Sequence, residues 1–263
     1  IGWRQRLPEL AQTITVSCLP ASVIPAPAAG PDQPLQIPGC FHRAESQNAA
    51  VSAGAPETER FIEYLRRSTR ILIFTGAGIS TGSGIPDFRG PAGVWKRRQP
   101  VYYQDFMRSE AARIEHWEYK LEGWTAFRDA KPNATHDAAV RLERAGKLLM
   151  VVTQNIDGLH SRAGTSRERL VELHGTNSSI ECQTCHQLSD PEPHFEQFQK
   201  TRQPPRCRCG GYLKPATISF GQNLRPEDLE RAESAARQAD FVIALGSTLS
   251  VHPAAGVPLL AAR

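Results

Sequence analysis

Continuous apolar runs alternate with amphipathic stretches along most of this chain. Three runs of four or five residues are apolar throughout, which is typical of parallel strands buried on both faces: 71–74, 148–152 and 241–245. Helix-period patterns lie between them, most clearly at 133–145 and 226–238. The alternation predicts an α/β fold with a parallel sheet, right-handed crossovers and helices on both faces.

Small or polar residues follow each buried run. Gly76 and Gly78 follow the first, TQNIDGLH (153–160) the second and Gly-Ser-Thr (246–248) the third. Open α/β sheets bind ligands just past the carboxyl ends of their strands, and glycine lets a ligand approach the backbone. The spacing of Gly76, Gly78 and Gly82 is one residue longer than the dinucleotide fingerprint. On this loop alone, a phosphate cradle and a tight turn are equally good interpretations.

The residues after the glycine loop favour the ligand site. Ile85-Pro86-Asp87-Phe88-Arg89-Gly90 places an acid, an aromatic ring and a guanidinium side by side. A plain turn has no need of that combination.

Four cysteines form two close pairs, 21 residues apart: Cys182, Cys185, Cys207 and Cys209. Four thiolates can surround zinc as a closed, structural site, and the polar, Pro-rich stretch between the pairs needs such a staple to fold. The second pair has one intervening residue instead of two. His186 and His194 are therefore alternative ligands.

The composition limits the partners. The chain has 263 residues, 40% of them hydrophobic, and a net charge of +4. This mild basicity fits phosphate ligands, but it lacks the concentrated basic stripe of a nucleic-acid-binding protein, so we expect no direct nucleic-acid binding. No apolar run reaches the length that spans a bilayer, so we expect no membrane partner.

Residues 1–55 are rich in Pro and Ala and lack sustained periodicity, which predicts a disordered arm. A transit peptide is the alternative interpretation. The sequence begins with Ile1 and shows no n-region, h-region and cleavage site in order. We therefore expect a fragment or trimmed product without a secretory signal, located in the cytoplasm, with organellar and nuclear locations as alternatives.

Taken in order, these features resemble the sirtuins, the Sir2-type NAD-dependent protein deacylases. The resemblance covers about 57–263 and rests on the four cysteines and five blocks: GAGISTGSGIPDFRG (76–90), TQNIDGLH (153–160), ELHG (172–175), FGQ (220–222) and GSTLSV (246–251).

The resemblance implies a Rossmann-like domain, a helical insertion and a small zinc module with one structural zinc ion. It assigns 56–263 to a catalytic domain made of Rossmann-like parts 56–90, 134–175 and 216–263, the helical insertion 91–133 and the zinc module 176–215. The family continues past the equivalent of Arg263, so we expect this domain to be incomplete at its C-terminus.

The resemblance also implies a role for each matching residue. NAD is the co-substrate, with its phosphates near Gly76, Ala77, Gly78 and Arg89, and with Gly246 and Ser247 as the second phosphate contact. Gln154 contacts the ribose. The nicotinamide pocket is framed by Ile85, Asp87, Phe88, Asn155 and Asp157.

The implied catalytic residues are Asn155 and His174, with His174 as the base. A histidine near its ordinary pKa can take a ribose hydroxyl's proton at neutral pH. His160 is the rival candidate, to which we assign a structural or supporting role.

We therefore predict an NAD-dependent lysine deacetylase or deacylase that releases nicotinamide, acting as a monomer on an acyl-lysine peptide held between the two domains. The alternatives are a protein mono-ADP-ribosyltransferase and a catalytically weak NAD-sensing module. Sirtuins that favour acidic acyl groups resemble one another in a Tyr-x-x-Arg pair. No such pair occurs near Tyr102, Tyr103 or Tyr119, which favours acetyl or other neutral acyl groups.

Overall fold

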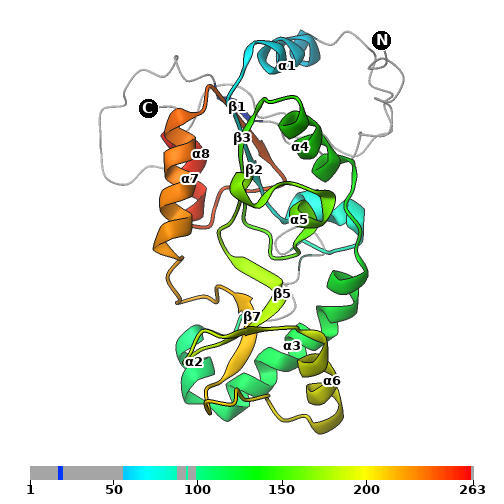
Figure 1. The fold of residues 1–263 in the computed structure, drawn as a ribbon, viewed down its shortest axis with the longest axis vertical. Coiled ribbons are helices and arrows are strands. Elements are labelled where there is room, and N and C mark those ends of the chain that lie inside the picture. The colour runs from blue at the N-terminus through cyan, green and yellow to red at the C-terminus, as the bar shows by residue number, and fades with distance from the viewer. Residues whose placement is uncertain (1–16, 20–55, 88–92, 94–98, 262–263) are drawn as a thin grey trace.

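The buried apolar runs form the centre of one sheet. The structure is a computed structural model that describes residues 17–19, 56–87, 93 and 99–261. Its larger sheet, whose strands β1, β2 and β3 are labelled in Figure 1, has the strand order β1-β8-β2-β3-β4. In that order the bounds are Ser17–Leu19, Phe241–Leu245, Ile71–Thr75, Leu148–Thr153 and Leu170–Glu172. The four strands from β8 to β4 are parallel, as the sequence predicts.

The edge strand β1 pairs antiparallel with β8. It lies in the stretch predicted to be a disordered arm, and these three residues differ from that prediction. The pairing supplies backbone partners for an otherwise open edge of β8. The rest of the arm, residues 1–16 and 20–55, lies outside the described residues.

Side chains of alternate residues point to opposite faces of the sheet, and helices cover both. One face, with Leu72, Phe74 and Val242, packs against α7 (Pro226–Gln238) and α8 (Val257–Leu260). The other, with Ile73 and Ile243, packs against α1 (Pro56–Arg67) and α4 (Ala134–Arg144). This confirms the predicted helix-covered sheet and explains why its strands are apolar throughout.

Shorter elements complete the larger domain. They are the 3-10 turn η2 (Ala77–Ser83) after β2, the helix α5 (Leu159–Ala163) after β3, and the 3-10 turns η4 (Arg167–Arg169) and η5 (Ala254–Gly256).

A smaller antiparallel sheet lies at the other end of the molecule, where Figure 1 labels β5 and β7. Its strand order is β6-β5-β7. Its strands are Leu188–Ser189, Gly175–Cys182 and Leu213–Thr217, and its helices α2, α3 and α6 are Tyr103–Arg108, Glu110–Asp129 and Glu192–Thr201. The predicted boundary between zinc module and Rossmann-like part, at 215/216, thus falls inside β7.

The aromatic residues of α3 form the core of this module, as their spacing suggests. The Trp117 side chain is fully buried, and its Nε1–H donates to the carbonyl of Leu213 at 3.0 Å. Phe195 and Phe198 of α6 pack on it, with ring centroids 5.2 and 5.7 Å away. The helical insertion and the zinc module therefore share one hydrophobic core.

Two glycines with the same backbone conformation give a test of the junction between the domains. Gly175 has φ +70° and Gly146 has φ +69°, but an added Cβ meets nothing within 4 Å at Gly146, whereas at Gly175 it collides with the carbonyl oxygen of Ala216. We expect Gly146→Ala to cost about 1–2 kcal/mol from the left-handed backbone alone. Gly175→Ala should cost a further ~1–3 kcal/mol from overpacking.

Denaturant unfolding of both variants measures this difference. Equal losses in the free energy of unfolding would contradict the close packing of β5 on β7.

Candidate functional site

A cavity of about 1270 Å³ lies between the carboxyl ends of the sheet strands and the smaller module. From the sheet side it is lined by the residues that follow β2, β3 and β8. From the module side it is lined by α3 and by the segment after β7. The cavity is thus where the sequence placed the ligand, at the strand ends and between the two domains.

The structure brings most of the predicted site residues to this cavity. Those that line it are Gly76, Ala77, Gly78, Asp87, Gln154, Asn155, His174, Gly246 and Ser247. Ile85 is buried beside Leu159, and Asp157 is buried behind Asn155. Phe88 and Arg89 lie outside the described residues.

The ends of β2 and β8 contact each other only because Gly76 and Gly78 have no side chains. A Cβ on Gly76 would lie 2.7 Å from the carbonyl oxygen of Gly246, and one on Gly78 would lie 2.9 Å from the Cα of Gly246. The N–H groups of Gly76 and Gly78 donate to Leu245 and Gly246 at 2.9 Å each. These two N–H groups are therefore engaged within the fold, and are not the free phosphate donors that the sequence suggested.

Asn155 and Asp157 belong to one buried hydrogen-bond network, and Ser80 joins them. Asn155 Nδ2 donates to the carbonyl of Gly76 at 3.2 Å and to Ser80 Oγ at 3.1 Å. Ser80 Oγ donates to Asp157 Oδ2 at 2.7 Å, and Asp157 Oδ1 accepts from the N–H of Leu159 at 2.9 Å. The Asp157 carboxylate thus orients Asn155 through Ser80 and does not itself line the cavity. Sequence reasoning missed Ser80, whose only signal was its place inside the glycine block.

A second set of contacts joins the loop after β2 to α4. Asn133 accepts from the N–H of Thr135 at 3.0 Å and so caps α4. Its Nδ2 donates to the carbonyl of Ile79 at 2.8 Å and to Ser83 Oγ at 2.9 Å. The loop is therefore held from both of its sides.

His174 follows β4, is half-buried and lines the cavity. Its Nδ1 lies 2.9 Å from the carbonyl oxygen of Gln154. A carbonyl only accepts, so Nδ1 carries the proton and the lone pair is on Nε2. Burial lowers the pKa of His174, opposed by that backbone hydrogen bond, so the ring is neutral near pH 7. A neutral imidazole with a free Nε2 is suited to act as a general base.

His160 has a different environment. It is almost fully buried, its Nε2 lies 3.1 Å from Thr75 Oγ1, and its ring packs 4.8 Å from that of His136. Burial, with a smaller effect of His136, lowers its pKa to about 3. His160 does not line the cavity, which supports the structural role assigned to it.

Sequence reasoning missed two further groups near the cavity. Glu172 precedes His174 by two residues, and burial, with Asp157 and Asp228, raises its pKa to about 7. The other group is a polar stripe of α3, a helix that the sequence placed in the helical insertion without a role at the site: Glu115, His116, Tyr119 and Lys120. The spacing of 116, 119 and 120 on one helical face was the available signal.

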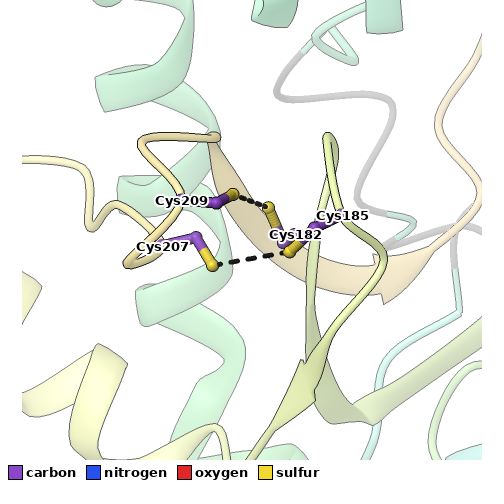
Figure 2. A group of neighbouring side chains, drawn as sticks. All are labelled: Cys182, Cys185, Cys207 and Cys209. Atoms are coloured by element: carbon purple, nitrogen blue, oxygen red, sulfur yellow. Dashed lines mark hydrogen bonds between the residues drawn. The ribbon is translucent and has the colours of Figure 1, made fainter.

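The four cysteine side chains of the smaller module point toward one another (Figure 2), and their four sulfur atoms all lie within 4.8 Å of one another. Cys182 and Cys209 sulfurs are 3.5 Å apart, and those of Cys185 and Cys207 are 3.7 Å apart. Four sulfurs at 2.3 Å from one zinc ion would be about 3.8 Å apart, so the set fits zinc.

The single-residue spacing of the second pair therefore does not prevent a four-sulfur cluster. His186 and His194 make other contacts. His186 Nδ1 lies 3.0 Å from Glu181 Oε1, and His194 Nε2 lies 2.9 Å from Ser189 Oγ.

We expect about one zinc ion per purified chain. Cys185→Ser should abolish stoichiometric zinc binding and loosen the packing of the module, because metal binding and folding are coupled there. Elemental analysis measures the zinc content, and near-ultraviolet circular dichroism measures the packing of aromatic residues such as Trp117. The neighbouring variant His186→Ala should retain its zinc. Full zinc occupancy in Cys185→Ser would contradict the four-sulfur site.

Comparison with known proteins relates this geometry to a family. The Sir2 family model matches residues 76–253. The NAD-dependent protein deacetylase 1 of Bradyrhizobium diazoefficiens is 41% identical over 205 residues, 78% of this chain and 81% of the relative. The NAD-dependent protein deacetylase of Haloarcula marismortui is 42% identical, over 76% of this chain and 78% of the relative.

Solved structures agree in fold. A Sir2 complex with a p53 peptide and NAD+ is similar at a TM-score of 0.70 and 35% identity, covering 78% of this chain and 82% of that one. Sir2Tm bound to a propionylated peptide is similar at a TM-score of 0.69 and 35% identity, covering 79% of this chain and 82% of that one.

Proposed function

The chain belongs to the Sir2 family, and from that premise we propose that its cavity brings NAD and an acyl-lysine peptide together, with His174 as the catalytic base. The protein is an NAD-dependent protein deacylase. In the overall reaction, acyl-lysine, NAD+ and water yield free lysine, nicotinamide, the acyl ester of ADP-ribose and a proton. The observation that carries the proposal for His174 is its Nδ1 contact with Gln154, which leaves Nε2 as the base.

We propose that the ends of β2 and β8 bind the phosphates and ribose of NAD. Gln154 Nε2 donates to Ser247 Oγ at 2.6 Å, so the two side chains are held together at the cavity wall. Gly76, Ala77, Gly78 and Gly246 line the cavity there, and we propose that the phosphates approach this stretch of backbone. Because the N–H groups of Gly76 and Gly78 bond within the fold, these two glycines would contribute space for the ligand and not hydrogen bonds. NAD supplies the electrophilic sugar carbon, and the protein's contribution is to hold it beside the acyl group.

The nicotinamide is proposed to lie against Asn155 and Asp87. Asn155 is fixed by two hydrogen bonds from its Nδ2, so its orientation is set before any ligand arrives. Asp157 and Ile85 support this pocket from behind. Phe88 and Arg89 stay predictions.

The acyl-lysine is proposed to enter between the domains, past Phe220 and Ile218, with its amide next to the sugar. The Nε2 of His174 then accepts the proton of the ribose hydroxyl that attacks the acyl group. The zinc ion would be held by the four cysteines and would supply stability only, because a closed four-sulfur set leaves no position for substrate.

None of the described helices has the length and hydropathy of a membrane span. We propose that the protein acts as a monomer without nucleic-acid partners and that it is located in the cytoplasm.

Removal of the base should stop acyl transfer. We expect His174→Ala to lower the steady-state rate at which the peptide loses its acyl group by about 10²- to 10⁴-fold, the usual contribution of a general base. The assay uses NAD and an acetylated peptide. His186→Ala is the matched control, because His186 lies in the module near the cysteines and should leave the rate unchanged.

Mass spectrometry of the products separates the alternatives. A deacylase yields a peptide without its acyl group and an acylated ADP-ribose, whereas a transferase adds ADP-ribose to protein. Acyl loss that survives His174→Ala would refute the assigned base. NAD binding without any turnover by the wild type would favour the sensing module.

A further inference from the structure

One lysine of α3 reaches the wall of the catalytic cavity. Lys120 lines the cavity, and its Nζ donates to Asn177 Oδ1 at 3.2 Å and to Thr217 Oγ1 at 3.3 Å. Asn177 belongs to β5 and Thr217 ends β7. The ammonium is therefore fixed by neutral oxygen atoms from two strands of the smaller sheet.

This position lies next to the proposed base. Thr217 pairs with Gly175 in the sheet, and the following N–H, of Ile218, donates to the carbonyl of His174 at 2.8 Å. Lys120, Thr217, Ile218 and His174 all line the same cavity. A group bound at Lys120 would thus be close to the acyl group that is held beside His174.

Positive charge around Lys120 is not balanced. Within the described part of the chain, Lys120 forms no ion pair, and the amine of Lys214, which is buried, lies close enough to repel it. Burial, with the charge of Lys214, lowers the pKa of Lys120 to about 7. The Lys214 Nζ donates to the backbone carbonyls of Pro215 and Thr217.

The nearby carboxylates do not neutralise the positive charge of Lys120. Glu181 pairs with Arg225 at 2.9 Å and lies 3.0 Å from His186. Glu115 lines the cavity but is exposed, and the buried His116 carries no negative charge. Lys120 is half-buried at the cavity wall, where an ammonium that faces no counter-ion is partly desolvated, and an anionic ligand group would reduce that cost.

We propose that Lys120 binds the end of an acyl chain that terminates in a carboxylate, so that the enzyme favours dicarboxylic acyl-lysines such as succinyl-lysine. This rests on the proposed deacylase function and deepens it. The acyl carbonyl stays at the reacting sugar carbon, while the chain extends along the wall to Nζ. The absence of a Tyr-x-x-Arg pair favoured neutral acyl groups, but Lys120 provides a cation that this sequence pattern does not include.

The experiment compares three forms of one peptide, with acetyl-, butyryl- and succinyl-lysine. Butyryl and succinyl have the same chain length, so their kcat/KM ratio isolates the carboxylate. We expect wild type to favour succinyl over butyryl, and Lys120→Met to lower that ratio at least tenfold. Lys120→Arg should keep most of the preference. Lys200→Met, an exposed lysine of α6, is the matched control and should keep all of it.

Two kinetic results would overturn the proposal. One is a wild type that does not prefer succinyl over butyryl. The other is an equal loss on all three peptides in Lys120→Met, which would indicate a structural role.

Binding of the three peptides to wild type and Lys120→Met, measured by fluorescence anisotropy, separates this proposal from the function on which it rests. If no peptide is turned over, the proposed function fails, whereas selective weakening of succinyl-peptide binding by Lys120→Met still supports the carboxylate site. Equal binding by the two proteins would refute that site.

Discussion

The site depends on the contact between the ends of β2 and β8. Gly76 and Gly78 lie so close to Gly246 that a Cβ on either would collide with its backbone. This packing holds the loop after β2 at a fixed position, where Asn155 donates to the carbonyl of Gly76 and to Ser80 of the loop, and Ser80 donates to Asp157. A preorganised pocket of this kind needs no rearrangement of its polar groups at the moment of reaction.

The smaller module provides the other wall of the cavity, and its position depends on two unlike supports. Trp117 and the phenylalanines of α6 form an apolar core, and four sulfurs are placed to hold one metal ion. The pairing of β5 with β7 connects this module to His174, because Gly175 and Thr217 face each other directly beside the base. Unfolding of the module would therefore also displace His174, because β5 and β7 connect the two.

The same geometry gives α3 two functions. One face carries Trp117 into the module core, and an adjoining face presents Lys120 to the cavity. Since Trp117 anchors the helix three positions earlier, the Lys120 amine has a fixed position at the cavity wall. The proposed selection among acyl groups depends on this fixed position.

Much of this molecule followed from the order of residues alone. Apolar runs predicted β2, β3 and β8 to within a residue or two, because a strand buried on both faces tolerates no polar position. The cysteine spacing predicted the metal cluster, and the ordered blocks indicated the family.

Tertiary structure decided what depends on distances between segments that are far apart in the chain. The glycines at 76 and 78 proved necessary for contact with Gly246, Ser80 joined the site, and Lys120 reached the wall beside His174 across a gap of 54 positions in the sequence. Local sequence patterns do not predict such contacts, because the contacts form only when the sheet and the module pack together.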